Sequence, residues 1–223
     1  MKIAARGKVL FVTDHSILNP GNLLMVQERE RTLARLLKRS GWQQLDALRG
    51  FEAGCSTGYN LRMLVQWGGR PEHMAGIDLD GEAVDYCKAH APEIRVHEGS
   101  ADAIPEGDGS FDLSMAFTLF SSVPDEAVSR GIARELVRIT RPGGLILVYD
   151  MRRRNPSNKS VHPVSRDDIR RWFPRAQMRA HSLTLAPPLA RMAGARAPWL
   201  YGPLAAMPPL RTHNLFVIKL PVS

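Results

Sequence analysis

Cysteine, lysine and long apolar runs are all scarce in this sequence of 223 residues. Its two cysteines, Cys55 and Cys87, cannot by themselves make a disulfide framework or a zinc site, so no metal is predicted. No apolar run approaches the roughly 20 residues of a membrane helix, and residues 9–12 are too few for the apolar core of a signal peptide. We therefore expect a cytoplasmic protein without a membrane partner.

Only six of the 30 basic residues are lysine, and the charge is unevenly distributed along the chain. Residues 1–111 have a net charge of −2, whereas residues 112–223, with 17 basic and 7 acidic side chains, have a net charge of +10. Such an excess of arginine can neutralise the phosphates of a nucleic acid. The basic half nevertheless shows no regular interleaving of aromatic residues and no zinc knuckle. Nucleic acid is therefore not the partner that we expect.

Helical and strand-like patterns alternate along most of the chain. A strand–helix alternation is typical of a doubly wound α/β fold with a mostly parallel sheet. The pattern predicts helices at 23–39, 61–65, 82–90 and 125–140, and strands at 73–78, 94–96, 111–117, 145–149 and 215–218. Residues 45–53 lead into a glycine-rich run. Arg141-Pro142-Gly143-Gly144 ends the fourth helix, because proline cannot continue a helix and glycine accepts a positive φ.

The alternation breaks between residues 151 and 211, where prolines are frequent and only 165–173 shows a clear helical pattern. This segment is typical of a lid over a substrate. We expect a single domain with four parts: an N-terminal helical cover (1–44), a cofactor-binding core (45–150), a substrate lid (151–211) and a last strand (212–223).

The most informative motif is FEAGCSTG at residues 51–58, followed twenty residues later by Asp78. Glycines at a strand-to-helix turn let a ligand approach the backbone, and a carboxylate at the end of the next strand can bind a ribose diol. The glycine spacing differs from the pyrophosphate-binding G-x-G-x-x-G motif. The acidic Glu52 beside the turn is unfavourable for pyrophosphate but suits a cationic amino acid. A nucleoside that carries an amino acid therefore fits better than a dinucleotide.

The sequence contains four motifs, which are FEAGCSTG at 51–58, GIDLD at 76–80, GSADAIPEGDGSFDL at 99–113 and ITRPGGLILVYD at 139–150. These four motifs resemble those of the class I S-adenosylmethionine-dependent methyltransferases of the small-molecule type. The resemblance covers residues 45–150. It implies a Rossmann-like, seven-stranded, mostly parallel sheet with helices on both faces, an antiparallel last strand and a C-terminal lid insertion. It also implies S-adenosyl-L-methionine as the cofactor.

The resemblance assigns cofactor-binding roles to residues on several loops. It places the methionine part at the first motif, the ribose at Asp78, and the adenine beside the residues that follow the second and third strands. An arginine of the N-terminal helix meets the cofactor carboxylate in many family members, although a solvated charged face explains the charges of this helix slightly better. The residues so assigned are Arg31, Glu52, Gly54, Ser56, Gly58, Asp78, Leu79, Ser100, Ala101 and Phe117.

Two residues depart from the family pattern. Ser56 replaces a glycine, which requires a φ that serine can adopt or a local shift of the loop. Ser100 replaces the usual aspartate, so the adenine contact is weaker or is made by another residue such as Asp102. These departures leave open a binding protein with a vestigial cofactor site.

The expected activity is methylation of a small molecule, with oxygen as the favoured acceptor atom, in specialised-metabolite or glycan biosynthesis. An RNA methyltransferase, and a family member that uses the cofactor for a non-methyl transfer or a cyclisation, remain alternatives. The arginines at 152–154 and 170–171 fall in the predicted lid. They indicate an acidic acceptor or, equally, a coding bias. The protein is expected to be a monomer or a homodimer.

A hydroxyl acceptor benefits from a general base within hydrogen-bond reach. The sequence does not identify this base, because the serines at 121 and 122 have no histidine beside them. The side chains that the pattern allows to reach the pocket are His15, Asp150, His162 and His213.

Overall fold

The computed structural model describes residues 16–154 and 161–222. The chain divides into two compact units, and each is described by itself. One unit holds helix α1 (Pro20–Arg39) together with Leu183–Arg211, and the other holds Ser40–Ser182 and Thr212–Ser223. Among the described residues, no helix combines the length and the apolar character that crossing a membrane requires.

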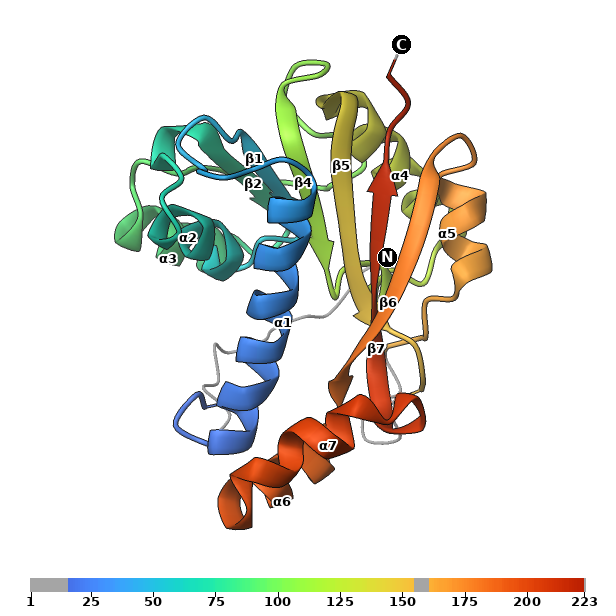
Figure 1. Cartoon of the computed structure of the whole chain (residues 1–223). Coiled ribbons are helices and arrows are strands. Elements are labelled where there is room, and N and C mark those ends of the chain that lie inside the picture. The colour runs from blue at the N-terminus through green and yellow to red at the C-terminus, as the bar shows by residue number, and fades with distance from the viewer. Residues whose placement is uncertain (1–15, 155–160, 223) are drawn as a thin grey trace. The chain divides into compact units, whose positions relative to one another are not determined.

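The larger unit is built on a seven-stranded sheet in the order β3-β2-β1-β4-β5-β7-β6 (Figure 1). Strands β1 to β5 pair in parallel, and β7 runs antiparallel to β5. The predicted doubly wound α/β fold with an antiparallel last strand is confirmed. The strands are β1 (Gly50–Ala53), β2 (Met74–Asp78), β3 (Arg95–Glu98), β4 (Phe111–Phe117), β5 (Thr140–Met151), β6 (Gln177–Leu185) and β7 (Arg211–Lys219).

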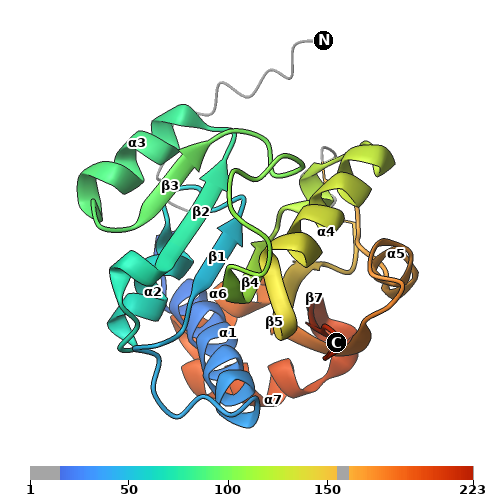
Figure 2. The ribbon, with the colours of Figure 1, turned by 90° about the horizontal axis from the view of Figure 1, so that it is seen from above.

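Side chains of successive strand residues point to opposite faces, and each face of this sheet is covered by helices. On one face, Leu61 and Leu64 of α2 lie against Gly76 and Gly50 of the strands. On the other face, α4 and α5 pack against the sheet (Figure 2). The helices of this unit are α2 (Tyr59–Gln66), α3 (Gly81–His90), α4 (Glu126–Ile139) and α5 (Arg166–Trp172), with short 3₁₀ turns at Pro71–His73 and Phe120–Ser122.

Side-chain caps fix where three of these helices begin. Asp80 accepts hydrogen bonds from the first turn of α3, and Asp125 does the same for α4. Ser165 and Asp168 form a reciprocal capping box at the start of α5. Helix α4 ends at Ile139, as the following proline and glycines predict.

The main hydrophobic core lies under α4 and α5. It brings alternate strand residues against one face of each helix, and it is closed by Phe120, whose ring stacks on Trp172 with centroids 4.7 Å apart. Residues buried in it include Phe51, Ala75, Ile77, Phe111, Ala116, Ile132, Leu136, Ile146, Val148, Ile169, Phe216 and Ile218.

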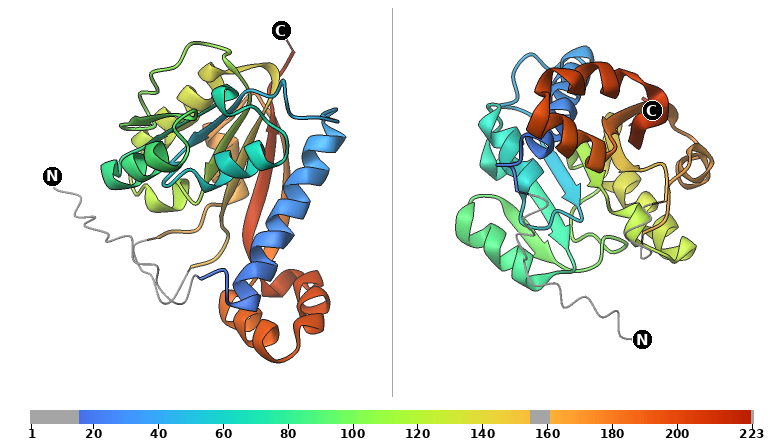
Figure 3. Two further views of the ribbon diagram at one scale, coloured as in Figure 1. Left: turned by 90° about the vertical axis from the view of Figure 1, so that its left-hand side faces the viewer. Right: turned by 90° about the horizontal axis from the view of Figure 1, so that it is seen from below.

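The smaller unit is helical, and α1 packs against α6 within it (Figure 3). The two backbones approach closely, because a Cβ added at Gly21 would lie 2.3 Å from the Ala190 carbonyl oxygen. Tyr201 donates a hydrogen bond to Glu28 of α1 (2.6 Å). The unit also holds α6 (Pro187–Arg196), α7 (Tyr201–Ala206) and 3₁₀ turns at Pro198–Leu200 and Pro208–Leu210.

Residues 151–211 are more regular than the sequence predicts. The proline pattern left only one clear helix there, but the structure adds strand β6 and helices α6 and α7. Pro187, Pro198 and Pro208 stand in the first positions of helical turns, where the missing N–H costs nothing, so they begin elements instead of interrupting them. Strand β6 supplies the seventh strand that the family resemblance implied.

Candidate functional site

The loop between β1 and α2 is held in a conformation that L-residues rarely adopt. Gly54, Ser56 and Gly58 have φ values of +70°, +46° and +77°. A Cβ added at Gly58 would lie 2.4 Å from the Cys87 sulfur, and one at Gly54 would lie 3.1 Å from Leu119. Ser56 thus has the positive φ expected of the glycine that it replaces in the family pattern. The serine side chain does not prevent this backbone conformation.

Asp78 ends β2 and fixes this loop. One oxygen of its carboxylate accepts a hydrogen bond from the Ser56 amide (2.7 Å), and the other accepts one from the Asp80 amide (2.9 Å). The amides of Gly54 and Cys55 both donate to the Ile77 carbonyl oxygen. A carboxylate can accept about four hydrogen bonds, so Asp78 keeps acceptor capacity for a diol.

The carboxylates of Glu52 and Asp78 make this end of the sheet negative. Glu52 lies in β1 with only 1% of its surface exposed, and its Oε1 accepts a hydrogen bond from Asn60 (2.6 Å). Burial raises the pKa of the Cys55 thiol, and the charges of Glu52 and Asp78 raise it further. Cys55 is therefore a protonated, buried side chain rather than a nucleophile, and the same field favours a bound cation.

The remaining predicted cofactor residues follow neighbouring strands. Leu79, directly after β2, is 71% exposed and offers a flat apolar surface. Ser100 and the buried Ala101 come after β3, and Phe117 ends β4 with its ring 5.6 Å from that of Tyr149. Because β1 to β4 are parallel, these residues lie at the same edge of the sheet, the one toward which the arrow of β4 points in Figure 1.

Comparisons with known proteins agree with this geometry. A sequence model described as a methyltransferase domain matches residues 51–144. Malonyl-[acyl-carrier protein] O-methyltransferase of Pectobacterium atrosepticum is 34% identical over 120 residues, which cover 52% of this chain and 42% of that protein. The 2-methyl-6-phytyl-1,4-hydroquinone methyltransferase of Synechocystis is 29% identical over 144 residues, which cover 59% and 43%. These similarities support a class I S-adenosylmethionine-dependent methyltransferase domain over residues 51–144.

The fold is shared with solved structures of methyltransferases at low identity. Geranyl diphosphate C-methyltransferase from Streptomyces coelicolor has a TM-score of 0.62 at 16% identity, over 86% of this chain and 77% of that one. A methyltransferase from Mesorhizobium loti has a TM-score of 0.58 at 16% identity, over 81% and 94%. The matched region spans 42% and 43% of the two curated relatives named above.

The residues of this candidate site fit S-adenosylmethionine. The cofactor carries a ribose diol, an adenine and a positively charged sulfonium. The Asp78 carboxylate suits the diol, exposed Leu79 suits the adenine, and the negative field of Glu52 suits the cationic end. Gly54 and Gly58 leave the space into which Leu119 and Cys87 pack, and these contacts hold the shape of the loop.

The sequence suggested two other residues, Arg31 and Asp102, as contacts of the cofactor. Arg31 is exposed on α1 in the smaller unit, and its contact with the cofactor carboxylate stays a prediction. Asp102, the suggested substitute for Ser100, lies against α4, because a Cβ added at Gly131 would be 2.8 Å from its Cβ.

Of the predicted candidate bases, three lie near the carboxyl end of β5. Asp150 is fully buried and accepts hydrogen bonds from the amides of Ser121 (3.0 Å) and Met151 (2.8 Å). The amide of His162 donates to the Ser121 carbonyl oxygen (3.0 Å), which places His162 beside this carboxylate. His213 of β7 stacks on Tyr149, with ring centroids 4.7 Å apart. His15 lies outside the described residues.

Burial raises the pKa of Asp150 above its ordinary value, against the opposing effects of its hydrogen bonds and of His162. An acid whose pKa is raised in the folded state stabilises the fold at low pH and loses that contribution as the pH rises through the folded pKa. We therefore expect the free energy of unfolding of the wild type, relative to Asp150→Asn, to fall as the pH rises above about 4.

Urea unfolding in steps of about one pH unit measures this difference, and the substitution keeps the size of the side chain. A difference that stays constant or grows toward neutral pH would show that ionisation of Asp150 carries no cost in the folded protein.

The arginines of the predicted lid divide into two groups. Arg170 pairs with Asp167 (2.9 Å), and Arg171 pairs with Asp168, so both are engaged on α5 itself. Arg153 and Arg154 are exposed, whereas Arg152 is half-buried directly after β5. Arg170 and Arg171 therefore give no support to an acidic acceptor. Of the three arginines that follow β5, only Arg152 is half-buried at the carboxyl end of that strand.

Three residues beside the site were not predicted. Asn60 holds Glu52, Leu119 lies against Gly54, and Thr118 has a φ of +54° directly after β4. Asn60 carried a weak signal, as a polar residue in the first turn of an otherwise apolar helix. Leu119 and Thr118 carried none, because their positions depend on how the β4 loop turns back over β1.

Proposed function

We propose that this chain transfers the methyl group of S-adenosylmethionine to a small-molecule acceptor, with an oxygen atom as the favoured acceptor. The observation that supports it best is the loop from Gly54 to Gly58, which has a positive φ at three positions and is bordered by the carboxylates of Glu52 and Asp78. This set of groups suits a nucleoside with a cationic amino-acid tail better than any phosphorylated ligand.

S-adenosylmethionine, when bound, supplies a methyl group that the positive sulfur already makes reactive. The remaining task of the protein is to align the acceptor and exclude water, which can supply about 7–11 kcal/mol of the barrier. We assign the binding of the cofactor to Asp78 and the β1–α2 loop. We assign the handling of an acceptor proton to the group formed by Asp150, His162 and His213, since a buried carboxyl with a raised pKa is closer to the range useful to a general base.

A small molecule is the proposed acceptor because the relatives named above are described as acting on a malonyl group held by a carrier protein and on a hydroquinone. An acidic group on the acceptor would suit Arg152. An RNA substrate is less well supported, because Arg170 and Arg171 are paired with acidic neighbours. We further propose that the protein works in the cytoplasm, in specialised-metabolite or glycan biosynthesis, as a monomer or a homodimer.

Incubation with S-adenosylmethionine labelled in the methyl group tests this proposal. We expect label in at least one small acceptor from a panel of phenols, carboxylic acids and sugars, and S-adenosylhomocysteine as the co-product by mass spectrometry. Asp78→Ala is expected to lose the transfer, whereas Asp85→Ala, an exposed acid on α3, retains it.

The alternatives give different products. Label in RNA with none in any small acceptor would replace the proposed function by RNA methylation. Methylthioadenosine in place of S-adenosylhomocysteine would show that the aminobutyryl chain, and not the methyl group, is used.

A further inference from the structure

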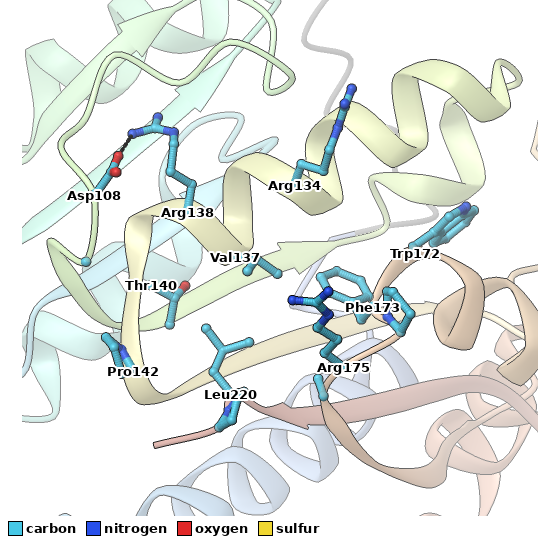
Figure 4. Close-up of a pocket in the computed structure, with 14 residues that line it drawn as sticks. Asp108, Arg134, Val137, Arg138, Thr140, Pro142, Trp172, Phe173, Arg175 and Leu220 are labelled. Atoms are coloured by element: carbon cyan, nitrogen blue, oxygen red, sulfur yellow. Dashed lines mark hydrogen bonds and ion pairs between the residues drawn. The ribbon is translucent and has the colours of Figure 1, made fainter. Parts of the chain in front are cut away.

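A pocket of about 780 Å³ opens at the amino ends of β4 and β5 in the larger unit. It lies between the second half of α4, the residues that follow α5 and the end of β7 (Figure 4). Thr140 and Pro142 of its wall begin β5, whereas Asp150 lies near the other end of that strand. The pocket is therefore at the opposite edge of the sheet from the candidate cofactor site, and its size is in the range of small-molecule sites.

The wall of this pocket is mostly apolar. Val137 on α4 is 38% exposed although it lies beside a hydrophobic core, and Figure 4 shows it facing the same space as Phe173 and Leu220. A helix residue of this size is commonly buried when it faces its own domain. The exposed apolar surface is thus suited to cover the chain or ring of a ligand.

The charges around the pocket are mainly positive. Arg175 extends over the apolar wall in Figure 4, and it has no hydrogen bond or ion pair with another residue that the structure describes. Arg175 and Lys219 together line an adjoining hollow of about 240 Å³. Arg138, in contrast, is neutralised by Asp108 and Glu135, each at 2.7 Å. Arg134 also lines the pocket, but its side chain points away from Val137 and Phe173 in Figure 4. The positive charge left for a ligand at the apolar wall therefore lies at Arg175 and Lys219.

We propose that this pocket binds an amphipathic organic anion. An apolar chain or ring lies against Val137, Phe173 and Leu220, and a carboxylate meets Arg175 and Lys219. An apolar cavity with a few convergent polar groups at one end orients such a ligand in a single direction. The proposal does not depend on methyl transfer, because none of these residues follows the carboxyl ends of β1, β2 or β4.

Calorimetric titration with decanoate tests the pocket, with decyltrimethylammonium as the matched cation of equal chain length. We expect decanoate to bind at one site per chain, and the cation to bind at least about tenfold more weakly. Saturating S-adenosylhomocysteine is expected to leave decanoate binding unchanged. If it displaces decanoate, the anion occupies the cofactor or acceptor region and the proposal is wrong.

Variants of exposed residues then locate the bound anion. Arg175→Gln is expected to weaken decanoate binding about threefold, and the double variant with Lys219→Gln about tenfold. Val137→Trp fills the apolar part and is expected to weaken the binding of both decanoate and the cation. Arg70→Gln, an exposed arginine outside the pocket, serves as the control. Thermal unfolding, measured in the absence of the cofactor, checks that each variant is folded.

Two further results would overturn the proposal. One is the absence of decanoate binding at millimolar concentration. The other is decanoate binding that Arg175→Gln and Val137→Trp leave at its wild-type strength.

Discussion

Replacement of Asp78 by alanine is expected to weaken the binding of S-adenosylhomocysteine by at least about 100-fold. The carboxylate has two roles at this position. It accepts hydrogen bonds from the amides of Ser56 and Asp80, and we expect its remaining lone pairs to accept from a ribose diol. Hydrogen bonds to a charged group contribute about 1.5–3 kcal/mol each, and a 100-fold loss corresponds to about 2.7 kcal/mol, so the loss of two such bonds is sufficient.

Two further variants separate these roles. Asp78→Asn keeps one oxygen that can accept from an amide, so it is expected to fall between the wild type and alanine. Asp85→Ala removes an exposed acid from α3 and is expected to bind normally. Calorimetry measures the affinities, and circular dichroism confirms folding. An affinity of Asp78→Ala within about threefold of the wild type would exclude a ribose contact at this carboxylate.

Replacement of Gly58 by alanine is expected to destabilise the fold by about 2–4 kcal/mol. A left-handed backbone costs an L-residue about 1–2 kcal/mol, and the new Cβ would lie 2.4 Å from the Cys87 sulfur. Either the loop or helix α3 must therefore shift, and the loop shape that Asp78 holds is lost. Urea unfolding measures the change in the free energy of unfolding.

A double-mutant cycle distinguishes the steric part from the backbone part. Cys87→Ala removes the sulfur, so the additional cost of Gly58→Ala is expected to be smaller in that background. Gly109→Ala is the matched control, because Gly109 has a φ of +61° but the added Cβ would make only an ordinary 3.7 Å contact. Equal costs at Gly58 and Gly109, with no effect of Cys87→Ala, would show that the contact with Cys87 is unimportant.

The parallel core of the fold could be predicted because its signals are local. The continuous apolar run at 145–149 requires a strand covered on both faces, and Arg141-Pro142-Gly143-Gly144 requires that the preceding helix end. Strand β6 could not be predicted in the same way. Its sequence QMRAHSLTL alternates weakly and stands at the edge of the sheet, where charged residues are tolerated.

The conformation of one loop of the candidate site could be predicted from its motif, whereas the mutual positions of candidate side chains from distant segments could not. The positive φ of Ser56 follows from its place in a glycine motif. The position of His162 beside Ser121 and Asp150 does not, because it depends on hydrogen bonds between residues that are about 30 or 40 positions apart in the chain. The pairing of Arg170 and Arg171 with acids of their own helix likewise becomes visible only once α5 is formed.

A crystal structure of the full chain with S-adenosylhomocysteine tests the central claim most directly. The account predicts both ribose hydroxyls within hydrogen-bond distance of the Asp78 carboxylate, the adenine against Leu79, and the amino-acid end along the loop from Gly54 to Gly58. A nucleoside bound elsewhere, with Asp78 holding only the amides of Ser56 and Asp80, would contradict it.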